Sequence, residues 1–165
     1  MIIWINGSFG VGKTSTAEVL KNELDKSVIY DPEEIGGFLS NMFNYEKDDF
    51  QDYELWRTLN SDILKYMCSK YEFVIVPMTI TNKDYYDEIV SQLIADGIKI
   101  NHIILNASRE NIIKRLDSRK DSTEWAYNQV DRCIKAFVEN KFNAKIIDTD
   151  NMTIEEVVKN IIDIL

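Results

Sequence analysis

The segment from Gly7 to Thr14 reads Gly-Ser-Phe-Gly-Val-Gly-Lys-Thr, which has the spacing G-x-x-x-x-G-K-[ST] of a phosphate-binding loop. Glycines let successive backbone N–H groups turn toward a phosphate without a clash from a Cβ atom. The N-terminus of a following helix would add partial positive charge. We expect Lys13 to reach the β- and γ-phosphates and the Thr14 hydroxyl to ligate Mg²⁺. The residues predicted to bind the nucleotide are Gly7, Ser8, Phe9, Gly10, Val11, Gly12, Lys13 and Thr14.

A second candidate, Asp31, directly follows a short apolar segment at 28–30. In small-molecule kinases the acceptor lies beside the end of the second strand. Asp31 could there orient or deprotonate an acceptor hydroxyl, or hold Mg²⁺ through water. The sequence Asp-Pro-Glu-Glu from Asp31 is also typical of a helix start with aspartate as the N-cap. The two roles are compatible, because a cap uses only one carboxylate oxygen.

Three arginines are candidates for contacts with anionic groups. Arg115 and Arg119 are four residues apart and would share one face of a helix. We expect them in a lid segment at about 115–125 that closes over the nucleotide and neutralises the transferring phosphoryl group, although surface ion pairs are the competing explanation. Arg57 could hold a polar or anionic part of the acceptor, or equally pair with acids of its own segment such as Asp52.

The end of the third apolar segment argues against other classes of phosphate-loop protein. Phe73–Thr79 ends in Pro-Met-Thr, without the acid that motor and remodelling ATPases need there. No Asp-x-x-Gly follows it, and Asn82-Lys83-Asp84 has the wrong spacing for a guanine-reading motif, so a switch GTPase is disfavoured. His102 lies within an apolar segment and is predicted to be a packed or edge histidine. The segment 148–151 could pass the adenine, but turn chemistry explains it equally well.

The elements that must position these residues alternate along the chain. Apolar segments predict strands at 2–5, 28–30, 73–76, 100–105 and 145–147. Helical patterns and caps predict helices at 13–26, from Pro32, at 49–71, from Asn82 to Asp96, from Ser108, from Asp121 to about Glu139, and from Thr153 to the last residue. Helices between apolar strands imply an α/β fold with a five-stranded parallel sheet covered on both faces. Ligands of such sheets bind at the carboxyl ends of the strands.

Composition limits the partners. The chain has 165 residues and no linker or repeat, which predicts one domain over 1–165. Its net charge of −9 disfavours nucleic acid as a ligand. No apolar run has the length of a membrane span and no charged leader precedes the first strand, so we expect a cytoplasmic protein without stable membrane insertion. Cys68 and Cys133 fit no metal or redox spacing and should be reduced.

Several blocks together resemble the tunicamycin resistance protein (TmrB-like) family of P-loop proteins. They are 2–14, Tyr-Asp-Pro-Glu at 30–33, 48–51 with 55–57, Val-Pro-Met-Thr-Ile at 76–80, 129–133 and 149–151. This family is similar to the nucleoside-monophosphate kinase and shikimate kinase group. The resemblance implies a three-layer P-loop NTPase fold, ATP binding, and protection against the nucleoside antibiotic tunicamycin.

Two functional hypotheses follow. The first is an ATP- and Mg²⁺-dependent phosphotransferase that acts on tunicamycin or a related nucleoside-like acceptor, with Lys13, Asp31, Arg115 and Arg119 in catalytic roles and Asp31 and Arg57 contacting the substrate. The second is a nucleotide-dependent module that sequesters a ligand without phosphoryl transfer. In either case the expected partner is a small molecule and the expected state a monomer or homodimer.

Overall fold

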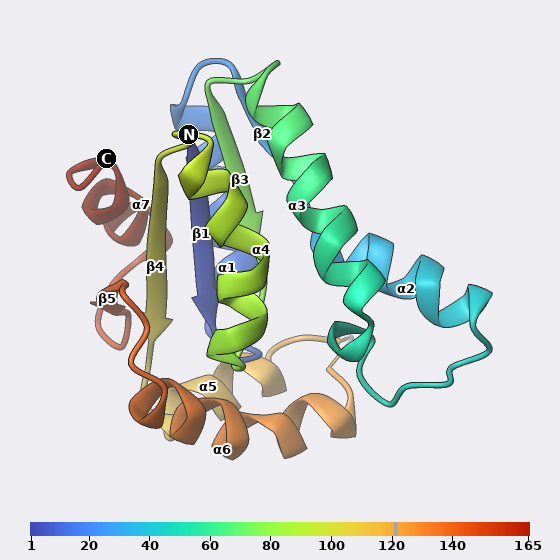
Figure 1. The fold of residues 1–165 in the computed structure, drawn as a ribbon. Coiled ribbons are helices and arrows are strands. Elements are labelled where there is room, and N and C mark those ends of the chain that lie inside the picture. Colours follow the sequence, from blue (N-terminus) through green and yellow to red (C-terminus); the bar gives the residue numbers. More distant parts are fainter. Residues whose placement is uncertain (121) are drawn as a thin grey trace.

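The computed structural model describes residues 1–120 and 122–165 as an α/β structure around one parallel sheet (Figure 1). The strands occur in the order β2-β3-β1-β4-β5, with β1 at the centre between β3 and β4. The strands are β1 (Ile2–Gly7), β2 (Ser27–Ile29), β3 (Phe73–Pro77), β4 (Ile100–Asn106) and β5 (Lys145–Asp148). The helices are α1 (Lys13–Glu23), α2 (Pro32–Met42), α3 (Glu54–Cys68), α4 (Lys83–Ala95), α5 (Arg109–Asp117), α6 (Glu124–Glu139) and α7 (Ile154–Ile162), with a 3₁₀ turn η1 (Phe50–Asp52). The predicted fold class is confirmed.

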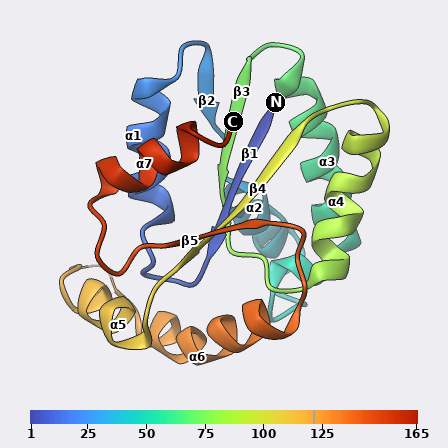
Figure 2. The same cartoon turned by 90° about the vertical axis from the view of Figure 1, so that its left-hand side faces the viewer.

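Helices cover both faces of the sheet, as the continuous apolar strands predicted. Seen from the side, α1 and α7 lie on one face and α3 and α4 on the other (Figure 2). Alternate residues of β1 point to opposite faces. Ile3 and Ile5 join the core under α1 and α7, whereas Ile2 and Trp4 join the core under α3 and α4. All four are fully buried, so the central strand is held from both sides.

The predicted helix starts are confirmed by their hydrogen bonds. Asp31 accepts from the backbone N–H of Glu33, and Asn82 accepts from those of Asp84 and Tyr85. Ser108 caps α5. Thr153 and Glu156 form the full capping box of α7. These caps fix where the loops at the carboxyl edge of the sheet give way to helix.

Some predicted helix boundaries differ from the structure; the helix expected over 13–26, for example, ends at Glu23. The helix expected over 49–71 is divided, because the side chain of Asp49 caps a 3₁₀ turn and Tyr53 is extended before α3 begins. The predicted start of the next-to-last helix, Asp121, lies outside the described residues. Within them, Thr123 is the N-cap of α6 and accepts from Ala126. Cys68 and Cys133 are free, as expected. In the described ranges, no helix combines the length and apolar character needed to cross a membrane.

The carboxyl ends of the strands lie at one edge of the sheet, where α5 and α6 cross beneath it (Figure 1). The phosphate-loop residues follow β1, and Asp31 follows β2. The order in which strands are added to the sheet also changes direction at the carboxyl end of β1. Helix α1 leads from β1 to β2 on one side of β1, whereas β4 lies on its other side. Such a switch point is where open α/β sheets bind ligands.

Candidate functional site

The phosphate-binding sequence forms the turn between β1 and α1. Gly10 and Gly12 have φ angles of 78° and 107°, which side chains with a Cβ atom rarely adopt. At Gly10 a Cβ atom would also lie 2.7 Å from Cγ of Leu116 on α5. Helix α1 begins directly after Gly12, and no side chain in the described part of the chain caps its first turn. The backbone N–H groups of this turn therefore face the loop, where a phosphate could accept from them.

The ammonium group of Lys13 folds over this loop. Its Nζ donates to the carbonyl oxygens of Gly7 at 3.1 Å and Ser8 at 3.0 Å. Burial lowers the pKa of Lys13 to about 8, although the nearby carboxylates of Glu33 and Asp31 favour the charged form. Lys13 is thus a cation held at low hydration beside the loop.

A small cavity of about 160 Å³ lies in front of the loop. The structure brings seven of the predicted residues together in its wall: Phe9, Gly10, Gly12, Lys13, Thr14, Asp31 and Arg119. Its other lining residues are Ser15, Glu33 and Pro77. This phosphate cavity therefore combines backbone N–H groups, two cationic side chains and two carboxylates.

A larger cavity of about 560 Å³ adjoins it on the side of α1, α5 and α7. The two cavities share residues of the loop and Arg119. The wall of the larger cavity includes Thr149, Met152, Ile154 and Val157. We call it the base cavity, after the nucleobase that the segment 148–151 could pass. Thr149 belongs to the segment 148–151 that was considered for contact with adenine. The apolar residues of α7 were missed, because the sequence pattern predicted only a helix there.

Arg115 lines the base cavity, and its guanidinium group is already bound to protein oxygens. It donates to the carbonyl oxygen of Val11 at 3.0 Å, and to the hydroxyl and carbonyl oxygens of Thr149 at 2.9 and 2.7 Å. Arg115 thereby connects α5 with the phosphate loop and with the segment after β5. Arg119 lines both the base and the phosphate cavity. The expectation that both arginines share one face of a helix is wrong: α5 ends at Asp117, so Arg119 lies in the segment after the helix, and the two arginines have different surroundings.

A third cavity, of about 390 Å³, opens on the side of α2 and the segment before α3. Aromatic, acidic and basic side chains line it together. Its wall contains Phe9, Glu33, Gly37, Ser40, Tyr45, Lys47, Asp48, Asp49, Phe50, Gln51, Met78, Thr79, Thr81, Trp125 and Arg132. Phe9 meets Trp125 edge to face, with ring centroids 4.9 Å apart. We call it the acceptor cavity, because it lies where the sequence placed the acceptor.

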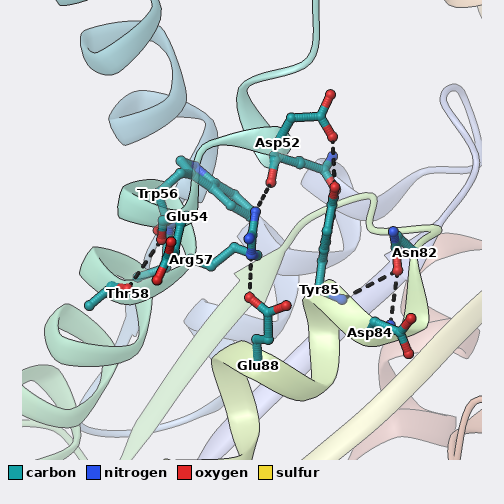
Figure 3. Close-up of polar contacts among 11 residues, drawn as sticks. Asp52, Glu54, Trp56, Arg57, Thr58, Asn82, Asp84, Tyr85 and Glu88 are labelled. Atoms are coloured by element: carbon teal, nitrogen blue, oxygen red, sulfur yellow. Dashed lines mark hydrogen bonds and ion pairs between the residues drawn. The ribbon is translucent and has the colours of Figure 1, made fainter. Parts of the chain in front are cut away.

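Arg57 lies outside the linings of these three cavities. Figure 3 shows its guanidinium group between helices α3 and α4. It forms an ion pair with Glu88, donates to the carbonyl oxygen of Gln51 at 2.7 Å, and lies over the ring of Tyr85 at 4.2 Å. The hydroxyl of Tyr85 in turn donates to Asp52 (Figure 3). The ionic partner of Arg57, Glu88, is thus on α4. Through Gln51, Arg57 supports the backbone of the segment before α3 that lines the acceptor cavity.

The residues after β3 brace the loop where motor ATPases have an acid. The Thr79 hydroxyl donates to the carbonyl oxygen of Gly7 at 2.9 Å, and Gln51 donates to the carbonyl oxygen of Thr79 at 3.1 Å. The amide of Asn6 bonds both the backbone N–H and the carbonyl of Ile80. The Val-Pro-Met-Thr-Ile block therefore connects the phosphate loop with the acceptor cavity.

His102 is packed, as expected. Its ring stacks on Tyr86 with centroids 4.2 Å apart, and its Nε2 lies 3.2 Å from the amide nitrogen of Asn6. Because that amide nitrogen is a donor, Nε2 is the accepting nitrogen of a neutral ring. Burial lowers the pKa of His102 to about 4.

Comparison with known proteins agrees with this geometry. Residues 2–140 match the family described as AAA domain. The chain belongs to that family. The structure of the tunicamycin resistance protein from Deinococcus radiodurans is similar to this AAA-domain protein with a TM-score of 0.80 and 29% sequence identity, over 98% of this chain and 93% of that one. The resemblance found in the sequence is therefore confirmed.

More distant structures share the fold of this AAA-domain protein. A sugar kinase from Janibacter has a TM-score of 0.70 at 14% identity, covering 98% of this chain and 92% of that one. A shikimate kinase from Bacteroides thetaiotaomicron has a TM-score of 0.60 at 15% identity, covering 99% and 97%. No curated protein matches the chain. The kinase-like P-loop fold is thus shown.

Proposed function

We propose that this protein is an ATP- and Mg²⁺-dependent phosphotransferase that acts on a small molecule carrying a hydroxyl group, with tunicamycin or a related nucleoside-like compound as the candidate acceptor. One observation carries the proposal: the phosphate cavity at Lys13 adjoins a base cavity on one side and an acceptor cavity on the other. Transfer between two bound molecules requires this arrangement, because the donor phosphate and the acceptor must meet at one point. The likeness to a tunicamycin resistance protein supports the choice of acceptor.

Different residues would bind the nucleotide, stabilise the transferring group and position the acceptor. Gly7–Thr14 would hold the triphosphate, with the charge of Lys13 directed at the β- and γ-phosphates. Arg119 lines the phosphate cavity, where its charge would stabilise the transferring group. Arg115 would fix the wall against which the base lies. Arg57 would act on the substrate indirectly, by holding the segment that contains Gln51.

The donor atoms at the phosphate cavity suit Mg²⁺. The hydroxyl of Thr14 and the carboxylate of Asp31 are hard oxygen ligands in one wall. Mg²⁺ is commonly held by one or two such groups together with substrate phosphates. Asp31 would bind it through water, since the cap on α2 uses one of its oxygens. When bound, the ion would neutralise charge that develops on the phosphoryl group.

A second candidate function is nucleotide-dependent sequestration of a ligand without transfer. Pro77 at the end of β3 favours it, because this position beside the phosphate cavity lacks the acid of conventional ATPases. In both versions the protein would act in the cytoplasm, where ATP is available, as a monomer or homodimer.

Mass spectrometry of acceptors incubated with the protein and Mg·ATP tests the proposal. The panel is tunicamycin and the four common ribonucleosides. A phosphotransferase adds the mass of one phosphoryl group to a member of the panel and releases ADP. The Lys13→Ala variant should lose nucleotide binding and transfer while its thermal unfolding remains cooperative. Tight acceptor binding without added mass would instead support sequestration, and unchanged ATP affinity in Lys13→Ala would overturn both versions.

A further inference from the structure

A further cavity, of about 450 Å³, lies between the start of α4 and the C-terminal half of α6. Its wall contains Thr81, Asn82, Lys83, Asp84, Arg132, Ala136 and Asn140. Figure 2 shows these two helix segments next to each other, and the side-chain amide of Asn140 donates to the carbonyl oxygen of Thr81 at 2.7 Å. This hydrogen bond joins the two walls of the space, which we call the distal cavity.

The distal cavity adjoins the acceptor cavity. Thr81 and Arg132 line both spaces. On α6, Trp125 of the acceptor cavity, the shared Arg132 and Ala136 of the distal cavity follow one another at intervals of seven and four residues, which places them on one face of the helix. At 1.5 Å per residue, Trp125 and Ala136 are about 16 Å apart along the helix axis. A ligand that lies along this face can therefore occupy both cavities at once.

The charges around the distal cavity are balanced. Lys83 forms an ion pair with Asp87 on the next turn of α4. The other charged residues of the lining are Asp84 and Arg132, which have opposite signs. Asp84 would repel a phosphate or carboxylate that Arg132 attracts. The lining therefore favours a neutral ligand over an anion.

The hydrogen bonds of these side chains leave both donors and acceptors for a ligand. Asn82 caps α4 with its Oδ1 atom, which accepts from the backbone N–H groups of Asp84 and Tyr85, so the NH₂ group of its amide lies outside the cap. Arg132 donates through Nε to the side-chain oxygen of Gln129 at 2.6 Å, and its two Nη atoms lie outside that bond. The carboxylate of Asp84 adds an acceptor. A hydroxyl group both donates and accepts, so it can pair with either kind of partner.

We propose that the distal cavity binds a neutral, hydroxyl-rich unit of the acceptor, namely a glycosyl group joined to its nucleoside-like part. The inference rests on the proposed function, since it assumes that the nucleoside-like part occupies the acceptor cavity. The glycosyl unit then lies beyond Arg132, beside Asn82 and Asp84. Its binding adds to the affinity, because the second contact becomes intramolecular once the first part of the ligand is bound.

Glucosides of nucleosides test the distal cavity. The probes are the four ribonucleosides and their 2′-, 3′- and 5′-O-glucosides, titrated by calorimetry in the presence of Mg·ADP. At least one glucoside should bind about tenfold more tightly than its parent nucleoside, through hydrogen bonds that are made only in the distal cavity. Ala136→Phe should abolish this advantage, because the ring fills the distal cavity. It should leave the affinity for the parent nucleoside unchanged, because Ala136 lies outside the lining of the acceptor cavity.

The matched control is Lys135→Phe, which adds the same ring at the neighbouring residue of α6. Lys135 is exposed and lies outside both linings, so this variant should retain the advantage of the glucoside. A second variant covers the case in which Ala136→Phe disturbs α6, which loss of binding of the parent nucleoside would reveal. Asp84→Asn keeps the size of the side chain but removes its charge, and it should reduce the advantage at least about threefold.

The outcomes separate the distal cavity from the proposed function. Equal affinities for every nucleoside and its glucosides, an absence of binding by all probes, or an advantage that both variants retain would overturn the role of the distal cavity. Transfer of phosphate to tunicamycin, measured by mass spectrometry, decides the proposed function separately. A glucoside advantage that Ala136→Phe abolishes and Lys135→Phe retains would support the distal cavity even if no phosphate is transferred.

Discussion

The guanidinium group of Arg115 donates to both oxygen atoms of Thr149, at 2.9 Å to the hydroxyl and 2.7 Å to the carbonyl. A third hydrogen bond reaches the carbonyl oxygen of Val11 in the phosphate loop. One side chain therefore connects three segments that are far apart in sequence, and each of them contributes to the wall of the base cavity. Arg115 is in this respect a brace of the base cavity.

The Arg115→Lys variant tests this bracing role. A single ammonium group cannot reproduce the planar fork that serves three oxygens, so buried acceptors would lose partners. We expect the free energy of unfolding to fall by about 1–3 kcal/mol and the affinity for ATP to fall about tenfold, which corresponds to about 1.4 kcal/mol. Urea unfolding and calorimetric titration measure the two effects.

The control for Arg115→Lys is Arg109→Lys on the same helix. Arg109 is exposed and pairs with Asp131 at the surface, where ion pairs contribute little. This variant should retain both stability and ATP affinity. If Arg115→Lys retains them too, and only the transfer rate falls, then Arg115 acts on the phosphoryl group and the bracing role is wrong.

Local signals in the sequence were sufficient for much of the fold. The turn between β1 and α1, the five strands and the caps at Asp31, Asn82, Ser108 and Thr153 depend on neighbours within a few residues, and the structure confirms them. The division of the helix expected at 49–71 was missed, because the segment from Asp49 was interpreted as one continuous helix. The capping bond of Asp49 to Gln51 ends that pattern early.

The site itself depends on contacts across long stretches of sequence. Arg57 was considered with acids a few residues away, but its ionic partner is Glu88, 31 residues along the chain on α4. Glu33 was interpreted only as part of the helix start at Asp31. In the structure it lines both the phosphate cavity and the acceptor cavity, because α2 packs beside the phosphate loop. Spacing alone cannot show either relationship, since both arise when separate elements meet at the edge of the sheet.

Acid should destabilise the protein through His102. The pKa of this residue is about 4 in the folded protein, because of burial, and about 6.5 in an unfolded chain. The unfolded state therefore binds more protons between these values, so the stabilisation is complete above pH 6.5 and is lost as the pH falls toward 4. From pH 7 to pH 5 the loss attributable to His102 should be about 2 kcal/mol.

Urea unfolding of the His102→Gln variant isolates this term, since glutamine does not titrate and can still accept from Asn6. Carboxylates that titrate in the same range affect both proteins alike, and the difference between the two curves belongs to His102. Parallel curves from pH 7 to pH 5 would show that the folded protein accommodates a charged ring at this position.

Trp125 should report occupation of the acceptor cavity. Its side chain is 57% exposed and lines that cavity, whereas Trp4 and Trp56 are fully buried. Iodide in solution should therefore quench mainly the fluorescence of Trp125. Saturation with tunicamycin in the presence of Mg·ADP should reduce this quenching, because the ligand would cover the ring. Trp125→Phe is the control and should show little quenching at any ligand concentration. Undiminished quenching at saturation would place the acceptor elsewhere.

Binding of ATP should take up a proton at Lys13. In the free protein, burial gives Lys13 a pKa of about 8, and a triphosphate beside the ammonium group would raise it, because an opposite charge favours the protonated form. Affinity should therefore be constant below pH 8 and fall about tenfold per unit above it, until the raised pKa of the complex is reached. Calorimetry at pH 8 in two buffers of different ionisation enthalpy should show uptake of roughly half a proton per ATP. In Lys13→Arg the guanidinium stays charged throughout, so binding, even if weaker, should take up no proton. The same uptake in Lys13→Arg would assign the proton to another group.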